Sequence, residues 1–334
     1  MDYCCKEKKL MIFDGHSDIW TDVTIRTLNG ESDIIRKYHL NKLIEGKISG
    51  SIFVIWIDPP YTEEPYKRSM QIVDSIKKEF EYCKDSIVLA KSFDDVEKAL
   101  MENKIYVFIG LEGLSSIGEN LELIDFYHDF GARHASLTWN EENSLATGAK
   151  GNPNRGLTKI GKKAVRKINQ NSMILDVSHL NEKSFFDVTF ETDKPIIASH
   201  SNCRALCDVP RNLTDEQLRK ISGLNGLVGI NSFNEFVHKD LEKQTIEMLV
   251  NHVAHAADIM GVDHVGIGMD YCDFLDEDSM NGFSSQQTSY TKGLEDASKT
   301  YNIIIELEKA GFSRDEIEKI AYKNFHRIIK DITR

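Results

Sequence analysis

The sequence predicts a (β/α)8 barrel of the TIM type, and three observations lead to this prediction. Eight short runs of apolar or β-branched residues recur along the 334 residues. Several of these runs are almost continuously apolar, which is typical of strands buried on both faces of a parallel sheet. Helix-like segments separate the runs, and eight such alternations in a chain of this length favour a closed barrel over a doubly wound sheet.

The predicted strands are spread along the whole chain. The first four are LMIFDGH (10–16), GSIFVIWID (50–58), IYVFIGLEG (105–113) and ARHASLTWN (132–140). The last four are NSMILDVSH (171–179), KPIIASHS (194–201), GLVGINSF (226–233) and DHVGIGMDY (263–271). The segments between them are predicted to be helices.

Two of these helices carry clear start signals. Thr214 is followed three residues later by Gln217, and Ser313 is followed by Glu316 at the same spacing. Each pair matches a capping box, in which the two residues satisfy each other's backbone N–H groups. After the eighth strand, the polar stretch 275–292 is predicted to be a long loop that lines the active-site face and can act as a lid.

Charge and composition argue against two classes of partner. The formal net charge is -12, whereas nucleic-acid-binding surfaces are built from clustered Lys and Arg. The sequence shows no apolar stretch of signal-peptide or membrane-spanning length, so we expect a cytoplasmic protein with small-molecule partners and no membrane contact. The six cysteines form no CxxC pair and are expected to be free thiols.

Chemistry-bearing residues end the predicted strands, where the active sites of such barrels lie. His16 and Asp18 end the first strand, and because residues i and i+2 project to the same side, both can reach one ion. Other strand ends supply Glu112, His179, His200 and Asp270. Imidazole with carboxylate is a ligand set suited to Zn²⁺ or a similar divalent ion.

These residue types also suggest a chemistry. A carboxylate has two oxygens, so Glu112 can bridge two cations. Two ions about 3.5 Å apart can hold a hydroxide between them and polarise a substrate carbonyl. A nearby carboxylate, which we assign to Asp270, would shuttle the proton.

Each residue also has a purely structural interpretation. The pair of His16 and Asp18 is equally consistent with the polar end of an ordinary buried strand, and isolated histidines such as His252 are expected to be packed or on the surface. Asp14 and Asp176 precede the motif residues, and either orient imidazoles or are turn carboxylates. The metal site is favoured because five separate strand ends each supply a residue of a ligand type.

Seven motifs extend the pattern over nearly the whole chain, from about Met11 to Arg327. They are FDGHSD, GLEG, RHASLTWNEENSLATGA, GLTKIGKKAV, LDVSH, ASHSNCRALCDVPRNLTDEQL and GIGMDY. In order and separation they resemble the membrane dipeptidase (renal dipeptidase) family of metallopeptidases, within the amidohydrolase superfamily. The resemblance implies one metal-dependent hydrolase barrel over residues 1–334, a dipeptide substrate in which a C-terminal D-residue is tolerated, and a homodimer.

The resemblance also implies the roles of the site residues. Two zinc ions would hold a bridging hydroxide that attacks the amide bond. One zinc would be bound by His16 and Asp18 and the other by His179 and His200, with Glu112 bridging both. Asp270 matches the family's acid/base aspartate. Arg211 matches the arginine that receives the C-terminal carboxylate of the substrate, a task suited to a planar guanidinium group.

Two positions depart from the family pattern. Ser17 stands where the family often has Asn, and it is not expected to be a ligand. Trp139 stands where vertebrate members carry a histidine that contacts the substrate near the scissile bond. Because an indole N–H can donate but cannot accept or carry a proton, that contact must differ here, or be supplied by Asn140 or a neighbour.

Two alternatives remain open from the sequence. The first is another amidohydrolase-type reaction, such as hydrolysis of a cyclic amide or lactam. The HxD motif in place of HxH, Glu112 in place of a modified bridging lysine, and Arg211 argue against it. The second is a non-catalytic metal-binding barrel, which would be expected to lack a metal ligand or Asp270.

Overall fold

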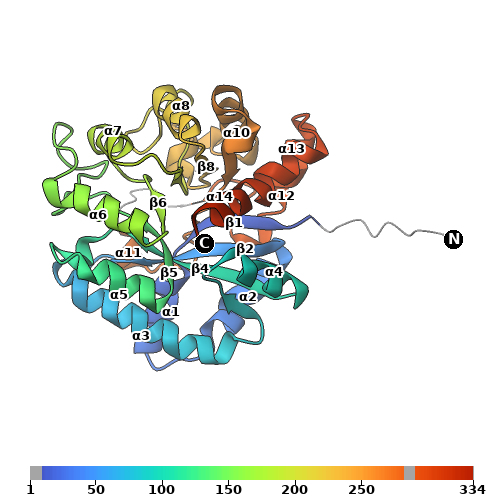
Figure 1. Ribbon diagram of the computed structural model, residues 1–334. Helices are drawn as coiled ribbons and strands as arrows, with labels where there is room; N and C mark the ends of the chain where they lie inside the picture. Colours follow the sequence, from blue (N-terminus) through green and yellow to red (C-terminus); the bar gives the residue numbers. More distant parts are fainter. Residues whose placement is uncertain (1–9, 282–289, 334) are drawn as a thin grey trace.

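Eight parallel strands form the closed barrel at the centre of the protein (Figure 1). The computed structural model describes residues 10–281 and 290–333. The barrel strands are β1 (Ile12–Ser17), β2 (Ile48–Trp56), β4 (Ile105–Glu112), β5 (Ala132–Ser136), β6 (Ile174–Asp176), β7 (Ile196–Ala198), β8 (Leu227–Ile230) and β9 (Val265–Ile267). The barrel closes where Asp14 of β1 pairs with Ile267 of β9. Each of the eight predicted strands is confirmed, and so is the fold class.

One further strand was not predicted. β3 (Ile87–Leu89) pairs with the start of β4, with Ile87 opposite Ile105. β5 takes over the pairing with β4 from Ile109 onward. β3 therefore lies at the edge of the barrel and is not one of its eight strands.

Helices surround the barrel on its outside (Figure 1). They are α1 (Ile19–Leu28), α2 (Leu40–Glu45), α3 (Pro65–Cys83), α4 (Phe93–Met101), α5 (Glu122–Phe130), α6 (Lys159–Gln170), α7 (Glu182–Glu191), α8 (Asp215–Gly223), α9 (Asn234–Val237), α10 (Ile246–Met260), α11 (Glu277–Asn281), α12 (Asn302–Lys309), α13 (Arg314–Glu318) and α14 (Asn324–Ile332). Both predicted capping boxes are present, Thr214 with Gln217 and Ser313 with Glu316.

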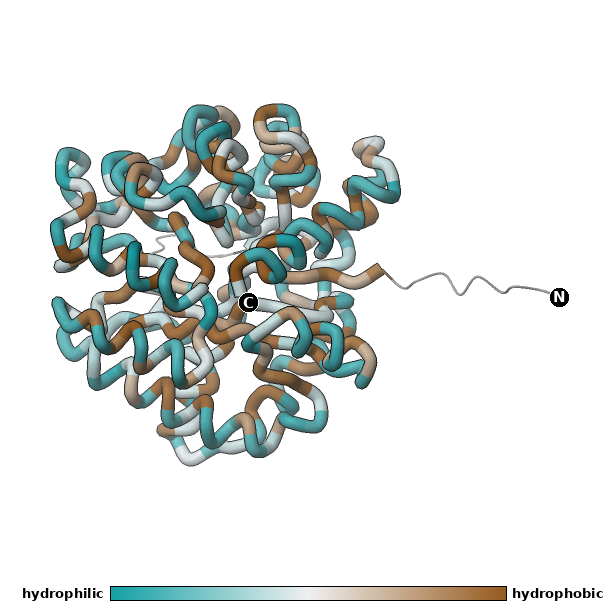
Figure 2. Tube along the Cα trace, in the orientation of Figure 1, coloured by the Kyte–Doolittle hydropathy of each residue, from teal (hydrophilic) through white to brown (hydrophobic). Residues whose placement is uncertain are grey.

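Alternation along the strands divides the core in two. On β4, Val107 and Ile109 belong to the cluster packed under the helices, whereas Tyr106 and Phe108 belong to the cluster that fills the barrel. Hydrophobic residues run along the central strands, and hydrophilic ones are common on the outer helices (Figure 2). Because side chains of a strand alternate between its faces, Glu112 continues the inward series and ends β4 pointing into the barrel mouth.

The opposite end of the barrel is closed by α14. The ring of Phe325 packs 4.8 Å from that of Phe13, near the start of β1. A Cβ added at Gly15 or Gly266 would lie 2.5 Å and 2.7 Å from the Phe325 ring, so these glycines provide the space for it. In the described part of the chain α14 therefore covers the floor, and the cavity of the barrel opens at the carboxyl ends of the strands.

Three further predictions can be compared with the structure. The predicted loop 275–292 is wrong in part, because α11 forms within it, and its residues 282–289 lie outside the described residues. Cys83, Cys203, Cys207 and Cys272 are free thiols, as predicted, whereas Cys4 and Cys5 lie outside the described residues. Among the described helices, none combines the length and apolar character needed to cross a bilayer.

Candidate metal centre

The five predicted metal ligands lie together at the mouth of the barrel. His16 is near the end of β1, Asp18 directly precedes α1, Glu112 ends β4, and His179 and His200 follow β6 and β7. All five are buried, with at most 6% of each side chain exposed. The Asp18 carboxylate lies 3.5 Å from His16 Nε2, so the HxD spacing does bring these two groups together.

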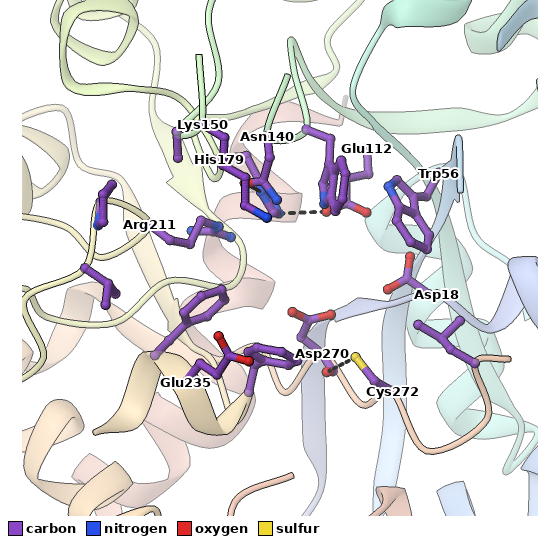
Figure 3. A pocket seen from close by; sticks show the side chains of 17 residues that line it. Asp18, Trp56, Glu112, Asn140, Lys150, His179, Arg211, Glu235, Asp270 and Cys272 are labelled. Atoms are coloured by element: carbon purple, nitrogen blue, oxygen red, sulfur yellow. Dashed lines mark hydrogen bonds and ion pairs between the residues drawn. The ribbon is translucent and has the colours of Figure 1, made fainter. Parts of the chain in front are cut away.

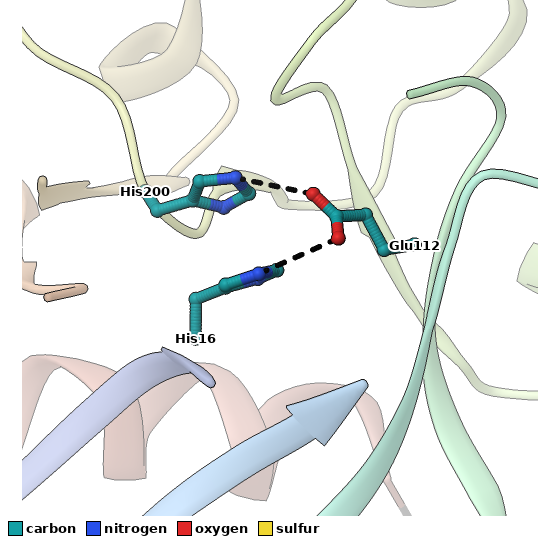
Figure 4. Close-up of side chains that lie close together, drawn as sticks. All are labelled: His16, Glu112 and His200. Atoms are coloured by element: carbon teal, nitrogen blue, oxygen red, sulfur yellow. Dashed lines mark ion pairs between the residues drawn. The ribbon is translucent and has the colours of Figure 1, made fainter. Parts of the chain in front are cut away.

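The two oxygens of Glu112 face two different sets of groups. Oε1 lies 2.9 Å from His179 Nε2 and 3.4 Å from His200 Nε2. Oε2 lies 3.6 Å from His16 Nε2 (Figure 4), and that nitrogen in turn lies 3.5 Å from the Asp18 carboxylate. This is the arrangement expected of a carboxylate that bridges two cation sites.

The histidine hydrogen bonds test whether these residues fit metal ions. His179 Nδ1 lies 2.9 Å from Asn140 Oδ1, which can only accept, so the Nδ1 atom carries the proton. Ser199 Oγ donates to Asp176 and therefore accepts from His200 Nδ1 at 2.7 Å. Both Nε2 atoms thus present lone pairs, yet they lie 2.9 Å apart. Two acceptors at this distance require a cation between or beside them.

His16 supplies a second indication. Both of its ring nitrogens are buried and have no hydrogen-bond partner among the described residues. Its Nε2 nevertheless faces three carboxylates, those of Asp18, Glu112 and Asp270, at 3.5 to 3.8 Å. Neutral imidazole and carboxylate are the ligands that Zn²⁺ accepts in hydrolytic sites, so the donor set fits divalent ions.

Burial sets the electrostatics of the site. Desolvation lowers the pKa of His179 and of His200 well below its ordinary value, so both are neutral and able to bind a metal. Desolvation also raises the pKa of Glu112 well above its usual range. Burial opposes a charge on His16, but the Glu112 and Asp18 carboxylates outweigh it and raise the His16 pKa to about 10. The buried carboxylates are therefore stabilised in their charged form by a cation beside them, a role that a metal ion would fill.

Asp14 and Asp176, whose roles the sequence left open, have different contacts in the structure. Asp176 does not touch a ligand imidazole; it holds Ser199, whose hydroxyl in turn accepts from His200. Asp14 accepts from the backbone N–H of Met269 at 2.8 Å and has no hydrogen bond to an imidazole in the described part of the chain. Asp176 therefore orients His200 through one intervening hydroxyl, and Asp14 anchors the closing strand β9. Ser199 was not predicted, although it directly precedes His200 at the strand end.

Asp270 stands across the mouth from Glu112. Its Oδ1 lies 3.8 Å from His16 Nε2, and its Oδ2 accepts from Asn231 Nδ2 at 2.9 Å. Desolvation raises the pKa of Asp270. The backbones of Asp270 and His179 are left-handed, with φ of 58° and 67°, a conformation that costs about 1–3 kcal/mol at a non-glycine residue. Such strain is typical of functional residues held in place by their surroundings.

The metal centre forms the base of a cavity of about 200 Å³ (Figure 3). Arg211 reaches it from one side, held by bonds from Nη1 to Ser201 Oγ and from Nη2 to the His200 carbonyl, both at 2.6 Å. Trp139 also lines it, with its ring 5.3 Å from that of Trp56. Each predicted substrate-binding residue therefore borders the cavity.

Asn140 has a contact that its prediction did not include. Its amide oxygen is used by His179, so in this position it orients a metal ligand, while its side chain also lines the cavity. Lys150 and Glu235 line the cavity too, and neither was predicted. Both lie away from the strand ends, on a loop and on the short helix α9, where no periodic pattern marks them. Asn231, by contrast, directly follows β8, and that position could have identified it.

Comparison with known proteins identifies the family that this chain matches. The sequence pattern of the family described as membrane dipeptidase (peptidase family M19) matches residues 6–334. Dipeptidase tcpJ of Claviceps purpurea is 28% identical over 311 residues, covering 90% of this chain and 70% of that protein. An uncharacterised protein from the pqqA 5' region of Klebsiella pneumoniae is 30% identical over 254 residues, covering 73% of this chain and 88% of its own length.

Solved structures share the fold. The crystal structure of a metallopeptidase from Rhodobacter sphaeroides, liganded with a phosphinate mimic of the dipeptide L-Ala-D-Ala, has a TM-score of 0.86. It is 23% identical and covers 97% of this chain and 100% of its own. The dipeptidase AC of peptidase family M19 has a TM-score of 0.85 at 24% identity, covering 97% of this chain and 99% of its own.

Proposed function

The chain belongs to the membrane dipeptidase family, peptidase family M19, and from this premise we propose that it is a zinc-dependent enzyme hydrolysing the amide bond of free dipeptides. The observation that carries the proposal is the position of Glu112, whose two carboxylate oxygens face separate sets of buried ligands. This position supports two zinc ions, one with His16 and Asp18 and one with His179 and His200.

The protein groups would divide the remaining work. When bound, the ions would activate a water molecule for attack and polarise the substrate carbonyl. Asp270, on the cavity side of His16, would take the proton from the attacking water and give it to the leaving amine. Burial raises its pKa toward the working range of such an acid/base group. Asn231 holds the carboxylate at one oxygen and leaves the other for the proton.

Arg211 would hold the C-terminal carboxylate of the dipeptide. Its guanidinium is buried, and its Nε has no hydrogen-bond partner among the described residues. A cation of this kind, fixed at two nitrogens, can orient a carboxylate with little loss of entropy. The dipeptide would thereby lie with its peptide bond over the metal centre and its free amino group toward the carboxylates on the far side of the cavity.

Trp139 and Asn140 concern the substrate rather than the ions. The indole of Trp139 can donate one hydrogen bond but cannot carry a proton, and Asn140 has its oxygen engaged with His179, which leaves its Nδ2 as a donor. We propose that these two N–H groups contact the substrate where vertebrate relatives use a histidine. The phosphinate mimic bound by the Rhodobacter sphaeroides structure ends in D-Ala, which supports tolerance of a C-terminal D-residue here.

The test is release of free amino acids from a panel of L,L and L,D dipeptides by purified protein, with and without added Zn²⁺. Asp270→Asn is the informative variant, and Asp273→Asn is its matched control, since that carboxylate pairs with Lys42 and does not line the cavity. Zinc-dependent turnover that Asp270→Asn lacks and Asp273→Asn keeps is the expected result. Stoichiometric zinc binding with no cleavage of any dipeptide would contradict the proposal and direct attention to lactams and other cyclic amides.

Three broader expectations complete the proposal. Residues 1–334 would form one hydrolase domain, the protein would be a homodimer, and it would act in the cytoplasm. A single cooperative unfolding transition would be expected of one domain. A solution mass near twice that of the chain by light scattering would be expected of the dimer, and cell fractionation would test the location.

A further inference from the structure

The cavity carries a second cation that the proposed reaction does not use. Lys150 lines the cavity beside Asn140 and His179 (Figure 3). No ion pair or hydrogen bond of its ammonium is found among the described residues. On the neighbouring helices α6 and α7, Lys162 pairs with Glu191 and Lys183 pairs with Asp187. Lys150 is thus an exposed cation that lines a ligand cavity in a protein that is acidic overall.

The backbone around Lys150 is fixed to the metal centre itself. The N–H of Lys150 donates to the Asn140 carbonyl at 3.0 Å, and the N–H of Ala149 donates to the His179 carbonyl at 2.7 Å. Gly148 forms a bridge with Leu180. The loop is thus held on both sides by residues that carry or adjoin metal ligands, so the base of the Lys150 side chain has a defined place relative to the reacting centre.

Lys150 lies on the same side of the cavity as Arg211 (Figure 3). The carboxylates of Asp18 and Asp270 lie on the other side. A dipeptide held by Arg211 at its C-terminal carboxylate would therefore have its C-terminal residue, not its N-terminal one, beside Lys150.

A dipeptide with a neutral side chain has one carboxylate, and Arg211 accounts for it. A second, unpaired cation at the same end calls for a second anionic group on the C-terminal residue. We propose that Lys150 is a specificity-determining residue that selects dipeptides whose C-terminal residue has an acidic side chain, Asp or Glu. This inference rests on the proposed dipeptidase function. Glu235 lies on the wall beyond Arg211, so the side chain of the substrate would be directed toward Lys150 and away from Glu235.

Isosteric substrate pairs test the proposal, because Glu and Gln differ in charge but hardly in shape. The measurement is kcat/KM for Ala–Glu against Ala–Gln, with L and D C-terminal residues, in zinc-loaded enzyme. The expected preference for Glu is roughly two- to fivefold and lies mainly in KM, the size of a partly exposed ion pair away from the scissile bond. Lys150→Met should reduce the ratio to about one by weakening Ala–Glu alone, and Lys150→Arg should restore it.

Lys159→Met is the matched control, since it removes the same charge from an exposed lysine that does not line the cavity. It should leave the Glu/Gln ratio unchanged. Equal kcat/KM for Ala–Glu and Ala–Gln in wild-type enzyme, or a ratio that Lys150→Met does not alter, would overturn the inference while the dipeptidase function stands. A preference for Ala–Lys that Glu235→Gln removes would also overturn it and make Glu235 the selecting charge.

Failure of the proposed function would be distinguishable from failure of this inference. If no dipeptide is cleaved, binding of Ala–Glu and Ala–Gln to the zinc-loaded protein is compared by calorimetry. Tighter binding of Ala–Glu that Lys150→Met abolishes would support the cation site without catalysis. Equal affinity for the two dipeptides would refute it.

Discussion

The hydroxyl of Ser199 offers a direct test of how the metal ligands are oriented. Ser199 connects Asp176 to His200: its Oγ lies 2.5 Å from Asp176 Oδ2 and 2.7 Å from His200 Nδ1. Ser199→Ala removes one oxygen and leaves every predicted metal ligand itself in place. Asp176 keeps its bonds to His134 and to the backbone N–H groups of residues 178 and 199, so the surrounding structure should persist.

The magnitude follows from what His200 loses. Its side chain is 1% exposed, so the Nδ1–H group would be left buried without an acceptor, at a cost of about 1–3 kcal/mol. That cost can be relieved only by moving the proton to Nε2, which removes the lone pair needed for a metal ion. Because about 1.4 kcal/mol corresponds to a tenfold change, zinc affinity at the site containing His200 should fall roughly 10- to 100-fold.

The assay is competition for Zn²⁺ against a chromophoric chelator, read at equilibrium for both ions. The variant should release one zinc at a lower chelator concentration and keep the other close to its wild-type affinity. Turnover at saturating zinc should remain within about threefold, since the reacting groups are unchanged. Ser51→Ala is the matched control: Ser51 is buried in β2 and its hydroxyl has no partner among the described residues.

Two outcomes would refute this reasoning. If Ser199→Ala and Ser51→Ala bind zinc alike, within about twofold of wild type, the hydroxyl does not orient His200. If both zinc sites of Ser199→Ala weaken equally, the effect is a general loss of structure. Circular dichroism and the unfolding midpoint of each variant would separate the second case from a local effect.

Three other predictions concern Asn231, His252 and Phe325. Asn231→Ala, which frees the carboxylate of Asp270, should lower kcat roughly tenfold and shift the pH–rate profile with little effect on zinc content; an unchanged profile would count against it. Burial lowers the pKa of His252 to about 4, below the ordinary 6.5 of the unfolded chain. Because the unfolded chain then binds the proton first, the free energy of unfolding should be unaffected by His252 above pH 6.5 and should fall by about 3 kcal/mol as the pH drops toward 4. Urea unfolding of wild type and His252→Gln at pH 7.5 and 5 should show the smaller loss in the variant, and parallel losses would exclude this role. Phe325→Ala should reduce the unfolding free energy by about 3–5 kcal/mol, and a loss below 1 kcal/mol would mean that the barrel floor contributes little.

The sequence predicted the barrel and the ligands because both depend on position along the strands. Each of the eight apolar runs is long enough to show its character, and parallel strands in a barrel bring their carboxyl ends to one mouth. His16 and Glu112 are nearly a hundred residues apart in the chain, yet their positions at strand ends are enough to place them together. The two capping boxes could also be predicted, because the residues that form each box lie within four positions of the sequence.

The features that were not predicted depend on contacts between separate segments, and no periodic pattern in the sequence reveals such contacts. Lys150 and Glu235 reach the cavity from a loop and from a one-turn helix. The function of Asp176 required knowledge of Ser199, twenty-three residues away. Asn140 was correctly placed at the cavity, but its bond to His179 depends on how the loop after β5 folds toward the loop after β6.

The seal formed by α14 has a consequence for how the protein is made. The barrel closes only when β9 reaches β1, and its floor receives Phe325, Ile328 and Ile329 later still. During synthesis the first strands emerge long before their final neighbours exist, so apolar strand faces stay uncovered until the segment 325–329 has left the ribosome. Chaperones should therefore be needed throughout the synthesis of the barrel, and nascent chains stalled even a short distance before residue 325 should stay protease-sensitive throughout.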